Sequence, residues 1–290
     1  MARTRTGNFP IGFRQAFEPW QQDVPGIAAW ARDNDFEVVD LTGKFADQRQ
    51  VAQDAGLAVG TLDLPTWQAM MSPDDARRKD AVAQQAAFVT EHGKAGVKHY
   101  FVVFLPEDPS RKRRENFDTL VKSLAELAPA LEKVGADIVI EGYPGPGALG
   151  CTPESLRAIF KEVDSPAMAI NFDPSHLIRM DIDAIRFLGE FAPRVRHVHA
   201  KDTEIDQEAV YALGREQPGT QYQPVRFGGT FWRYCLPGHG QFAWAEGFAI
   251  LEQAGYQGYV TIELEDCNFN GSEEGERAGL LASREYLKSC

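Results

Sequence analysis

The sequence predicts a single (β/α)₈ TIM-barrel domain over residues 1–290. Eight short β-rich segments alternate with helical segments along the whole chain, which is the pattern of a parallel sheet covered by helices. Several β-rich segments are almost continuously apolar, as strands buried on both faces should be. An open doubly wound sheet is the alternative, but it would more often carry a glycine-rich turn after its first strand. The segment IGFRQAFEP is not such a turn.

The strands and helices can be placed one by one from their local patterns. The expected strands are residues 9–14, 36–41, 57–64, 98–105, 136–143, 168–174, 195–202 and 259–266. The expected helices are residues 25–34, 46–56, 72–93, 117–134, 152–163, 181–191, 241–254 and 272–288. Typical start signals support these helices, such as Pro73 and Pro153 at the first helical position after a serine or threonine cap. Pro129 is expected to kink the helix that contains it.

One interval between strands is too long for a simple connection. From His199 to Glu263 the chain runs 64 residues, against 32 from Glu141 to Asp173 and 26 from Asp173 to His199. The excess lies in residues 203–240, which are rich in Gly, Pro, Gln and aromatic residues and show no clear apolar period. Loops of this length in a compact domain are usually disordered or functional. The aromatic residues favour an ordered lid, inserted after the seventh strand at the mouth of the barrel.

Composition and charge narrow the class of protein. The formal net charge is −12, and residues 111–114 are the only basic run, so a nucleic-acid partner is not expected. The four cysteines match no CxxC metal pattern, and no apolar segment follows the N-terminal arginines. No stretch approaches the roughly 20 apolar residues that cross a bilayer. We therefore expect a soluble cytoplasmic protein without a membrane partner.

Four polar residues sit late in neighbouring predicted strands. They are Glu141, Asp173, His199 and Glu263. Because the active sites of such barrels lie at the C-terminal ends of the strands, we expect these side chains to converge. A lone acid at a strand end is more often a helix cap or a loop anchor, but three uncompensated carboxylates packed together are costly, and a cation is the simplest compensation. The donor set suits one divalent cation such as Mn²⁺, Mg²⁺ or Co²⁺, and the lack of sulfur ligands argues against a structural zinc.

Five segments together resemble a known family. They are IEGYPG, NFDPSH, HVHAKD, LPGHGQFAW at residues 236–244, and GYVTIELED. In this order and spacing they are similar to the xylose isomerase-like barrel superfamily, which includes sugar isomerases and epimerases, inosose dehydratases and endonuclease IV. The resemblance covers nearly the whole chain, and it implies a sugar or keto-sugar substrate and a homo-oligomer, a dimer or a tetramer.

The resemblance also implies roles for individual residues. Glu141, Asp173, His199 and Glu263 would bind one metal ion, Mn²⁺ before Mg²⁺, Co²⁺ or Zn²⁺, and Glu141 and Glu263 would also be the catalytic acid and base. His176, three residues after the aspartate, would contact substrate hydroxyls. The first histidine of HVHAKD, His197, would lie one layer deeper as a filler or a support.

The chemistry implied is proton removal next to a carbonyl group through an enediolate, which a divalent cation stabilises. Lys201 and Arg233 are further candidates for contacting a substrate oxygen, although an ordinary surface or salt-bridge role suits each equally well. No glycine-rich phosphate cradle is evident, which favours an unphosphorylated ligand.

Three alternatives remain open at this point. β-Elimination or 4-epimerisation of a 3-keto-glycoside would use the same metal and base, and an aromatic lid would suit the bulkier substrate. An endonuclease IV-like activity is disfavoured by the acidic charge and by Asp40 and Asp63, which end two strands where that branch carries additional histidines. A non-catalytic sugar-binding barrel would bind ligand without exchanging its hydrogens.

Overall fold

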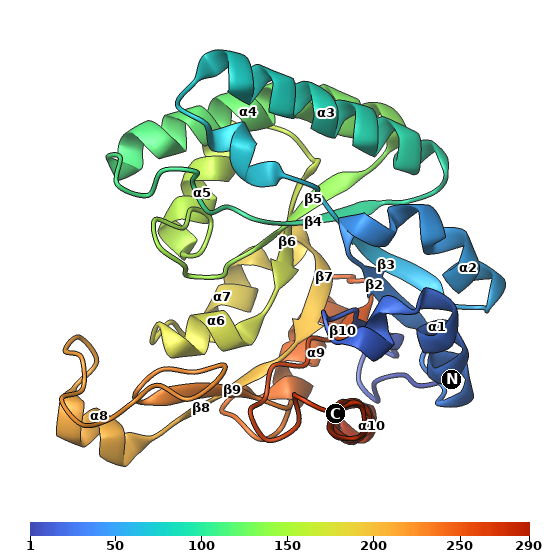
Figure 1. The fold of residues 1–290 in the computed structure, drawn as a ribbon, viewed down its shortest axis with the longest axis vertical. Helices are drawn as coiled ribbons and strands as arrows, with labels where there is room; N and C mark the ends of the chain where they lie inside the picture. Colours follow the sequence, from blue (N-terminus) through green and yellow to red (C-terminus); the bar gives the residue numbers. More distant parts are fainter.

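Eight parallel strands close into a barrel, which confirms the predicted fold class. The computed structural model describes residues 1–290, and hydrogen bonds link the strands in the order β1-β10-β7-β6-β5-β4-β3-β2 before the ring closes (Figure 1). The barrel strands are β1 (Ile11–Arg14), β2 (Val38–Leu41), β3 (Ala58–Asp63), β4 (His99–Val103), β5 (Asp137–Glu141), β6 (Met168–Phe172), β7 (Val195–Ala200) and β10 (Val260–Ile262). Each lies within a segment that the apolar runs of the sequence predict.

Helices surround the ring and connect its strands. They are α1 (Val24–Asp33), α2 (Arg49–Asp54), α3 (Asp75–Lys94), α4 (Arg113–Val134), α5 (Pro153–Glu162), α6 (Pro174–Arg179), α7 (Ala184–Phe191), α9 (Trp244–Gln253) and α10 (Glu273–Ser289). Side-chain caps fix several of their first turns: Asp74 accepts hydrogen bonds from two backbone N–H groups of α3, and Thr152 forms a capping box with Ser155 at the start of α5. No helix combines the length and apolar character needed to span a membrane.

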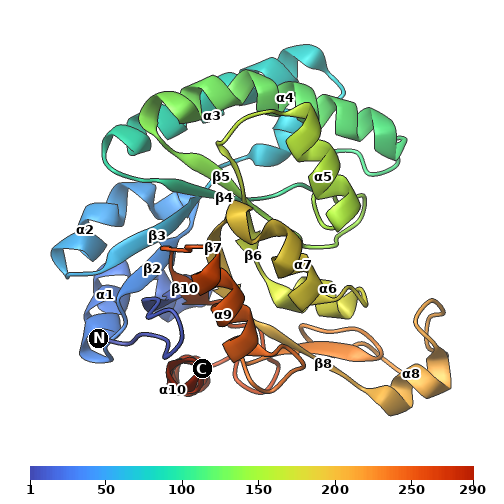
Figure 2. The same cartoon turned by 180° about the vertical axis from the view of Figure 1, so that it is seen from behind.

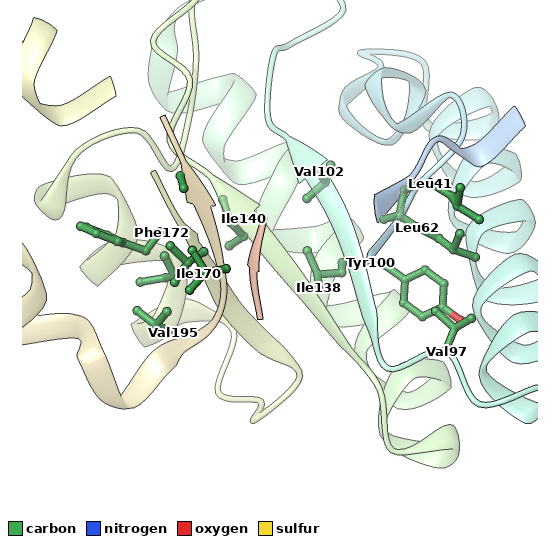
Figure 3. Close-up of a cluster of buried hydrophobic side chains, with 14 of the residues drawn as sticks. Leu41, Leu62, Val97, Tyr100, Val102, Ile138, Ile140, Ile170, Phe172 and Val195 are labelled. Carbon is green, nitrogen blue, oxygen red and sulfur yellow. The ribbon is translucent and has the colours of Figure 1, made fainter. Parts of the chain in front are cut away.

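The apolar core lies mainly between the ring and the helices. Alternate strand residues such as Tyr100, Val102, Ile138 and Ile140 point outward into this layer, as Figure 3 shows. The inward apolar cluster is much smaller and comprises Phe101, Val139 and Ala169. The remaining inward positions near the C-terminal ends of the strands are therefore available to polar residues.

The insertion after β7 forms structure that the sequence did not predict. β8 (Asp202–Ile205) and β9 (Trp232–Cys235) pair antiparallel outside the ring, and α8 (Gln207–Leu213) lies between them. This arm lies on the opposite side of the molecule from α3 and α4 (Figure 1, Figure 2). Each strand has only four residues, too few for an alternating pattern to be recognised among so many Gly, Pro and Gln residues.

The insertion has an inner part, which comprises the strand pair β8 and β9, and an outer part between these two strands. In the inner part, Asp202 accepts hydrogen bonds from the backbone of Gly238 and Phe242 and from the indole of Trp244, and Thr203 donates to the carbonyl of Ser175. Residues 206–231 form the outer part, and most of them are exposed. The inner part is therefore anchored on the barrel by buried hydrogen bonds, whereas the polar contacts of the outer part with the barrel are two ion pairs at its surface, Arg215 with Asp181 and Arg226 with Glu18.

Candidate active site

The four predicted ligands stand at the same end of the barrel. Glu141 is the last residue of β5, Asp173 follows β6, His199 is the fifth residue of β7, and Glu263 follows β10. Asp173 also caps α6, because its Oδ1 accepts the backbone N–H of Ser175 at 2.8 Å. That bond turns Oδ2 towards the cluster, where this buried oxygen has no hydrogen-bond partner.

The donor atoms of these side chains lie close together. His199 Nδ1 is 2.6 Å from Glu141 Oε2 and 3.6 Å from Glu263 Oε2. One donor atom from each of Glu141, Asp173, His176 and Glu263 lies within 4.8 Å of all the others. The three predicted acids thus meet His176, whose Nε2 lies 3.3 Å from Glu141 Oε1 and 3.4 Å from Asp173 Oδ2. His199 meets Glu141 and Glu263 and also stands in a deeper group with Asp40 and His197.

Lys201 enters the same cluster from the end of β7. Its fully buried Nζ lies 3.3 Å from Asp173 Oδ2, 2.5 Å from Glu263 Oε2 and 3.0 Å from Glu265 Oε2. Burial lowers the pKa of Lys201, but Asp173 and the two glutamates raise it well above its ordinary value. The lysine is therefore a cation held by three carboxylates, and it neutralises part of their charge.

The two glutamates remain anionic because neighbouring histidines, and Lys201 in the case of Glu263, lower their pKa values. Burial and the charge of Glu263 raise the pKa of Glu141, but His199 and His176 lower it to a net value of about 2. Burial likewise raises the pKa of Glu263, but Lys201 and His199 lower it well below the ordinary range. Burial lowers the pKa of His199, whereas Glu263 and Glu141 raise it well above its ordinary value.

A deeper polar layer supports His199. The carboxylate of Asp40 lies 2.9 Å from His197 Nε2 and 3.5 Å from His199 Nε2, and it accepts hydrogen bonds from the Thr261 hydroxyl at 2.6 Å and the Thr61 backbone at 2.9 Å. All these groups are fully buried. Asp40, His197 and His199 are near enough to form a second metal-binding group, but the donors around Asp40 already satisfy its oxygens. A carboxylate behind an imidazole is the usual support of a histidine ligand.

Arg14 at the end of β1 holds Glu263 from the other side. Its guanidinium binds both oxygens of Asp63 at 2.8 and 2.9 Å, and its Nε lies 3.2 Å from Glu263 Oε1. The same group lies 4.2 Å from the ring centre of Phe101, which stacks on His199. Sequence reasoning missed Arg14, although a charged residue at the end of the apolar segment FPIGFR was a usable signal.

The insertion contributes Tyr234 to the cluster. Its hydroxyl lies 2.6 Å from His176 Nδ1 and 2.7 Å from Arg179 NH1. Arg233, the residue that the sequence singled out, lies on the opposite face of β9 because successive strand residues alternate. It pairs with Glu204 at 2.7 Å and Asp266 at 3.2 Å, and none of its polar contacts is with the four predicted ligands.

A cavity of about 250 Å³ opens beside Glu263. The loop after β1, the outer part of the insertion and the segment after β10 line it. Its charged lining residues are Arg14, Arg226, Glu18, Glu263, Glu265 and Glu276. The aromatic rings of Phe17 and Phe227 also line it, and Phe17 is 84% exposed.

The donor set fits a divalent metal ion. Three carboxylates and one imidazole are the ligands that Mn²⁺ and Mg²⁺ accept, and the buried Oδ2 of Asp173 lacks a hydrogen bond. Lys201 and Arg14 are the two nearby lysine and arginine cations, and they are shared among Asp173, Glu263, Glu265 and Asp63. The alternative group at Asp47, Glu91 and His92 has two exposed acids and no comparable unsatisfied oxygen.

Comparisons with known proteins concern the family and the fold. A family model described as a xylose isomerase-like TIM barrel matches residues 15–290. An inosose dehydratase from Geobacillus thermodenitrificans (strain NG80-2) is 29% identical over 151 residues, which are 52% of this chain and 48% of the relative. The chain thus spans about half the length of the curated relatives it matches.

Two solved structures have a similar fold. The 3-keto-D-glucoside 4-epimerase from E. coli has a TM-score of 0.69 and 19% identity over 97% of this chain and 100% of its own. The D-psicose 3-epimerase from Clostridium cellulolyticum H10, solved with D-tagatose, has a TM-score of 0.69 and 16% identity with the same coverage of 97% and 100%. At these identities the likeness concerns the fold.

Proposed function

This chain belongs to the xylose isomerase-like TIM barrel family, and we propose that it is a divalent-metal-dependent enzyme that epimerises or isomerises a keto-sugar by moving a proton next to its carbonyl group. The observation that carries the proposal is the meeting of three carboxylates and an imidazole at the barrel mouth, with one buried carboxylate oxygen left without a hydrogen bond. The epimerase activity named for both solved relatives supports the same class of reaction.

Glu141, Asp173, His199 and Glu263 would hold the cation. When bound, it would supply a Lewis acid that polarises the substrate carbonyl and stabilises the negative charge left by proton removal. Asp40 Oδ2 lies 3.5 Å from the rear nitrogen of His199, which makes no hydrogen bond, so the carboxylate would support this ligand mainly through its negative charge.

Glu141 and Glu263 are the proposed acid and base. They stand on strands from different parts of the ring, so one can remove a proton from a carbon atom and the other can return a proton to it. Two imidazoles hold the oxygens of Glu141, whereas Arg14 and Lys201 hold those of Glu263. Both carboxylates are therefore fixed in place before substrate arrives, which reduces the reorganisation needed for reaction.

His176 and Lys201 are the proposed contacts to substrate oxygens. Both are buried N–H donors that lie against the ligand carboxylates. A substrate hydroxyl that reaches this cluster would meet these donors together with the carboxylates. Arg233 pairs with Glu204 and Asp266 instead, so it is not among the proposed substrate contacts.

The lining of the cavity favours an uncharged sugar over a sugar phosphate. Four glutamates face two arginines around it, and Arg14 is already bound to Asp63 through both terminal nitrogens. A phosphate placed there would meet an excess of negative charge, which costs free energy in a partly buried site.

A 3-keto-glycoside is the second candidate substrate, with β-elimination or 4-epimerisation as the reaction. The cavity beside Glu263 favours it, because Phe17 and Phe227 offer apolar surface where an aglycone would lie. The names of two similar proteins, a 3-keto-D-glucoside 4-epimerase and an inosose dehydratase, support the same alternative.

The outer part of the insertion is proposed as a lid over this cavity. Arg226 and Phe227 come from residues 206–231, and they line the cavity together with Phe17 from the loop after β1. The expected cytoplasmic location and homo-oligomeric state stay predictions.

The test is hydrogen exchange from D₂O into substrate. Mn²⁺-loaded protein is incubated with a panel of free ketohexoses, their phosphates and 3-keto-glycosides, and deuterium incorporation, epimers and released aglycone are measured. We expect incorporation next to the carbonyl of at least one unphosphorylated member, lost in Glu263→Gln and retained in Glu274→Gln, an exposed site on α10. Tight sugar binding without incorporation by any member would instead identify a non-catalytic binding protein.

A further inference from the structure

Tyr234 joins the insertion to the predicted metal site through two short hydrogen bonds. Its side chain comes from β9 and is only 3% exposed. The hydroxyl oxygen lies 2.7 Å from Arg179 NH1 and 2.6 Å from His176 Nδ1. No other hydrogen bond is made by this hydroxyl, so these two contacts determine where its single proton lies.

The direction of both hydrogen bonds follows from the chemistry of the partners. A guanidinium group can only donate, so the Tyr234 oxygen accepts from Arg179. The hydroxyl proton then has one acceptor within reach, which is His176 Nδ1. An imidazole nitrogen that accepts a hydrogen bond carries no proton, and the ring proton of the neutral imidazole is therefore on Nε2.

We propose that Tyr234 is a positioning residue that fixes the tautomer and orientation of His176. The fixed Nε2–H group points at Glu141 Oε1, 3.3 Å away, and at Asp173 Oδ2, 3.4 Å away. Hydrogen bonds run in one direction, from Arg179 through Tyr234 and His176 to Glu141, and Asp173 Oδ2 lies close to the same N–H without a hydrogen bond. The inner part of the insertion is thus a component of the site, a role that goes beyond the proposed lid.

Packing around Tyr234 holds this geometry. The guanidinium carbon of Arg179 lies 4.1 Å from the ring centre of Trp232, the first residue of β9. Lys201 Nζ lies 4.5 Å from the ring centre of Tyr234, and the rings of Tyr143 and Tyr234 both meet His176 edge to face at 5.4 and 5.3 Å. The phenol therefore has little freedom to turn away from the imidazole.

The first experiment is nitrogen-15 NMR of the histidine side chains in the metal-free protein, with the His176 signals identified by their absence in His176→Gln. We expect a single neutral tautomer for His176, with the proton on Nε2. In Tyr234→Phe the His176 tautomer should become mixed or reverse. The control is Tyr211→Phe, which alters a tyrosine of the same insertion that is 90% exposed, and it should leave the spectrum unchanged. A proton on His176 Nδ1 in the wild-type protein, or a tautomer unaltered by Tyr234→Phe, would overturn the proposal.

The second experiment measures Mn²⁺ affinity, and it rests on the proposed metal site. Removal of an outer hydrogen-bond partner of metal ligands typically weakens binding about 10- to 100-fold, so we expect Tyr234→Phe to raise the Kd for Mn²⁺ about 10-fold. In a His176→Gln background the same substitution should cost nothing more, because the imidazole it positions is gone. A full additional loss in that background would show that Tyr234 acts only through the general structure of the site.

These two experiments separate the inference from the proposed function. If wild-type protein shows the expected tautomer but does not bind Mn²⁺, the metal site is refuted and the positioning role stands on the NMR result. If Tyr234→Phe does not fold, Arg179→Met provides the second variant, since it removes the donor that orients the Tyr234 hydroxyl towards His176 Nδ1. That variant should also yield a mixed His176 tautomer, and a pure Nε2–H tautomer there would contradict the argument.

Discussion

Replacement of Asp40 by asparagine tests the support of His199 most sharply. In the wild-type protein one oxygen of Asp40 accepts the Thr61 N–H, and the other accepts from the Thr261 hydroxyl and His197. An amide keeps one accepting oxygen, and its NH₂ group cannot accept. The Thr261 hydroxyl and His197 Nε2 would therefore lose their carboxylate acceptor and keep the 2.9 Å contact with each other.

The expected loss of stability can be worked from these contacts. A buried polar group left without a partner costs about 1–3 kcal/mol. Because one hydrogen bond remains between these two donors, one unsatisfied group is expected, and Asp40→Asn should lower the free energy of unfolding by about 2 kcal/mol. The loss of the carboxylate behind His199 should also raise the Kd for Mn²⁺ by about 10- to 100-fold.

Chemical denaturation gives the first quantity and a Mn²⁺ titration gives the second. Asp47→Asn, which alters an exposed aspartate, is the matched control and should change neither. A loss of stability below about 1 kcal/mol together with an unchanged Mn²⁺ affinity would show that Asp40 is neither a structural anchor nor a support of the metal site.

Three further outcomes are expected. Phe17→Ala should raise the KM for an aryl 3-keto-glycoside several-fold and leave the KM for a free ketohexose unchanged, since only the aglycone would reach this exposed ring. Equal changes in the KM of both substrates would contradict the aglycone site. Thr152→Ala should lower the free energy of unfolding by about 1 kcal/mol through loss of the cap of α5, measured by urea denaturation. Leu120→Ala, at a fully buried position of α4, should cost about 2–5 kcal/mol in the same assay, and a cost below 1 kcal/mol would refute its place in the core.

The barrel and the convergence of its strand ends could be predicted because they follow from local patterns. Apolar runs locate the strands, and parallel strands bring their carboxyl ends to one face, so Glu141, Asp173, His199 and Glu263 could be placed there without coordinates. The pair β8 and β9 could not be predicted in this way. Its strands are short, and their pairing depends on the anchoring of the inner part of the insertion on the barrel.

The supporting residues of the site depend on closure of the ring. Asp40 and His197 are 157 residues apart in sequence and meet only because strands from both halves of the chain face the same interior. Tyr234 and His176 are 58 residues apart and meet because β9 folds back over α6. Such contacts depend on strand register and on the alternation along β9, which also turns Arg233 away from the site.

Four side chains at the barrel mouth, Glu141, Asp173, His199 and Glu263, are proposed to hold one divalent metal ion. The direct measurement is the stoichiometry and affinity of Mn²⁺ binding, followed by electron paramagnetic resonance, in wild-type protein and in Asp173→Asn. Asparagine is as good a helix cap as aspartate, so the start of α6 is preserved while one anionic ligand is lost. We expect one Mn²⁺ per chain in the wild-type protein and at least about 100-fold weaker binding in the variant, with an unchanged circular dichroism spectrum. Absence of Mn²⁺ binding by wild-type protein, or equal affinity in both proteins, would contradict it.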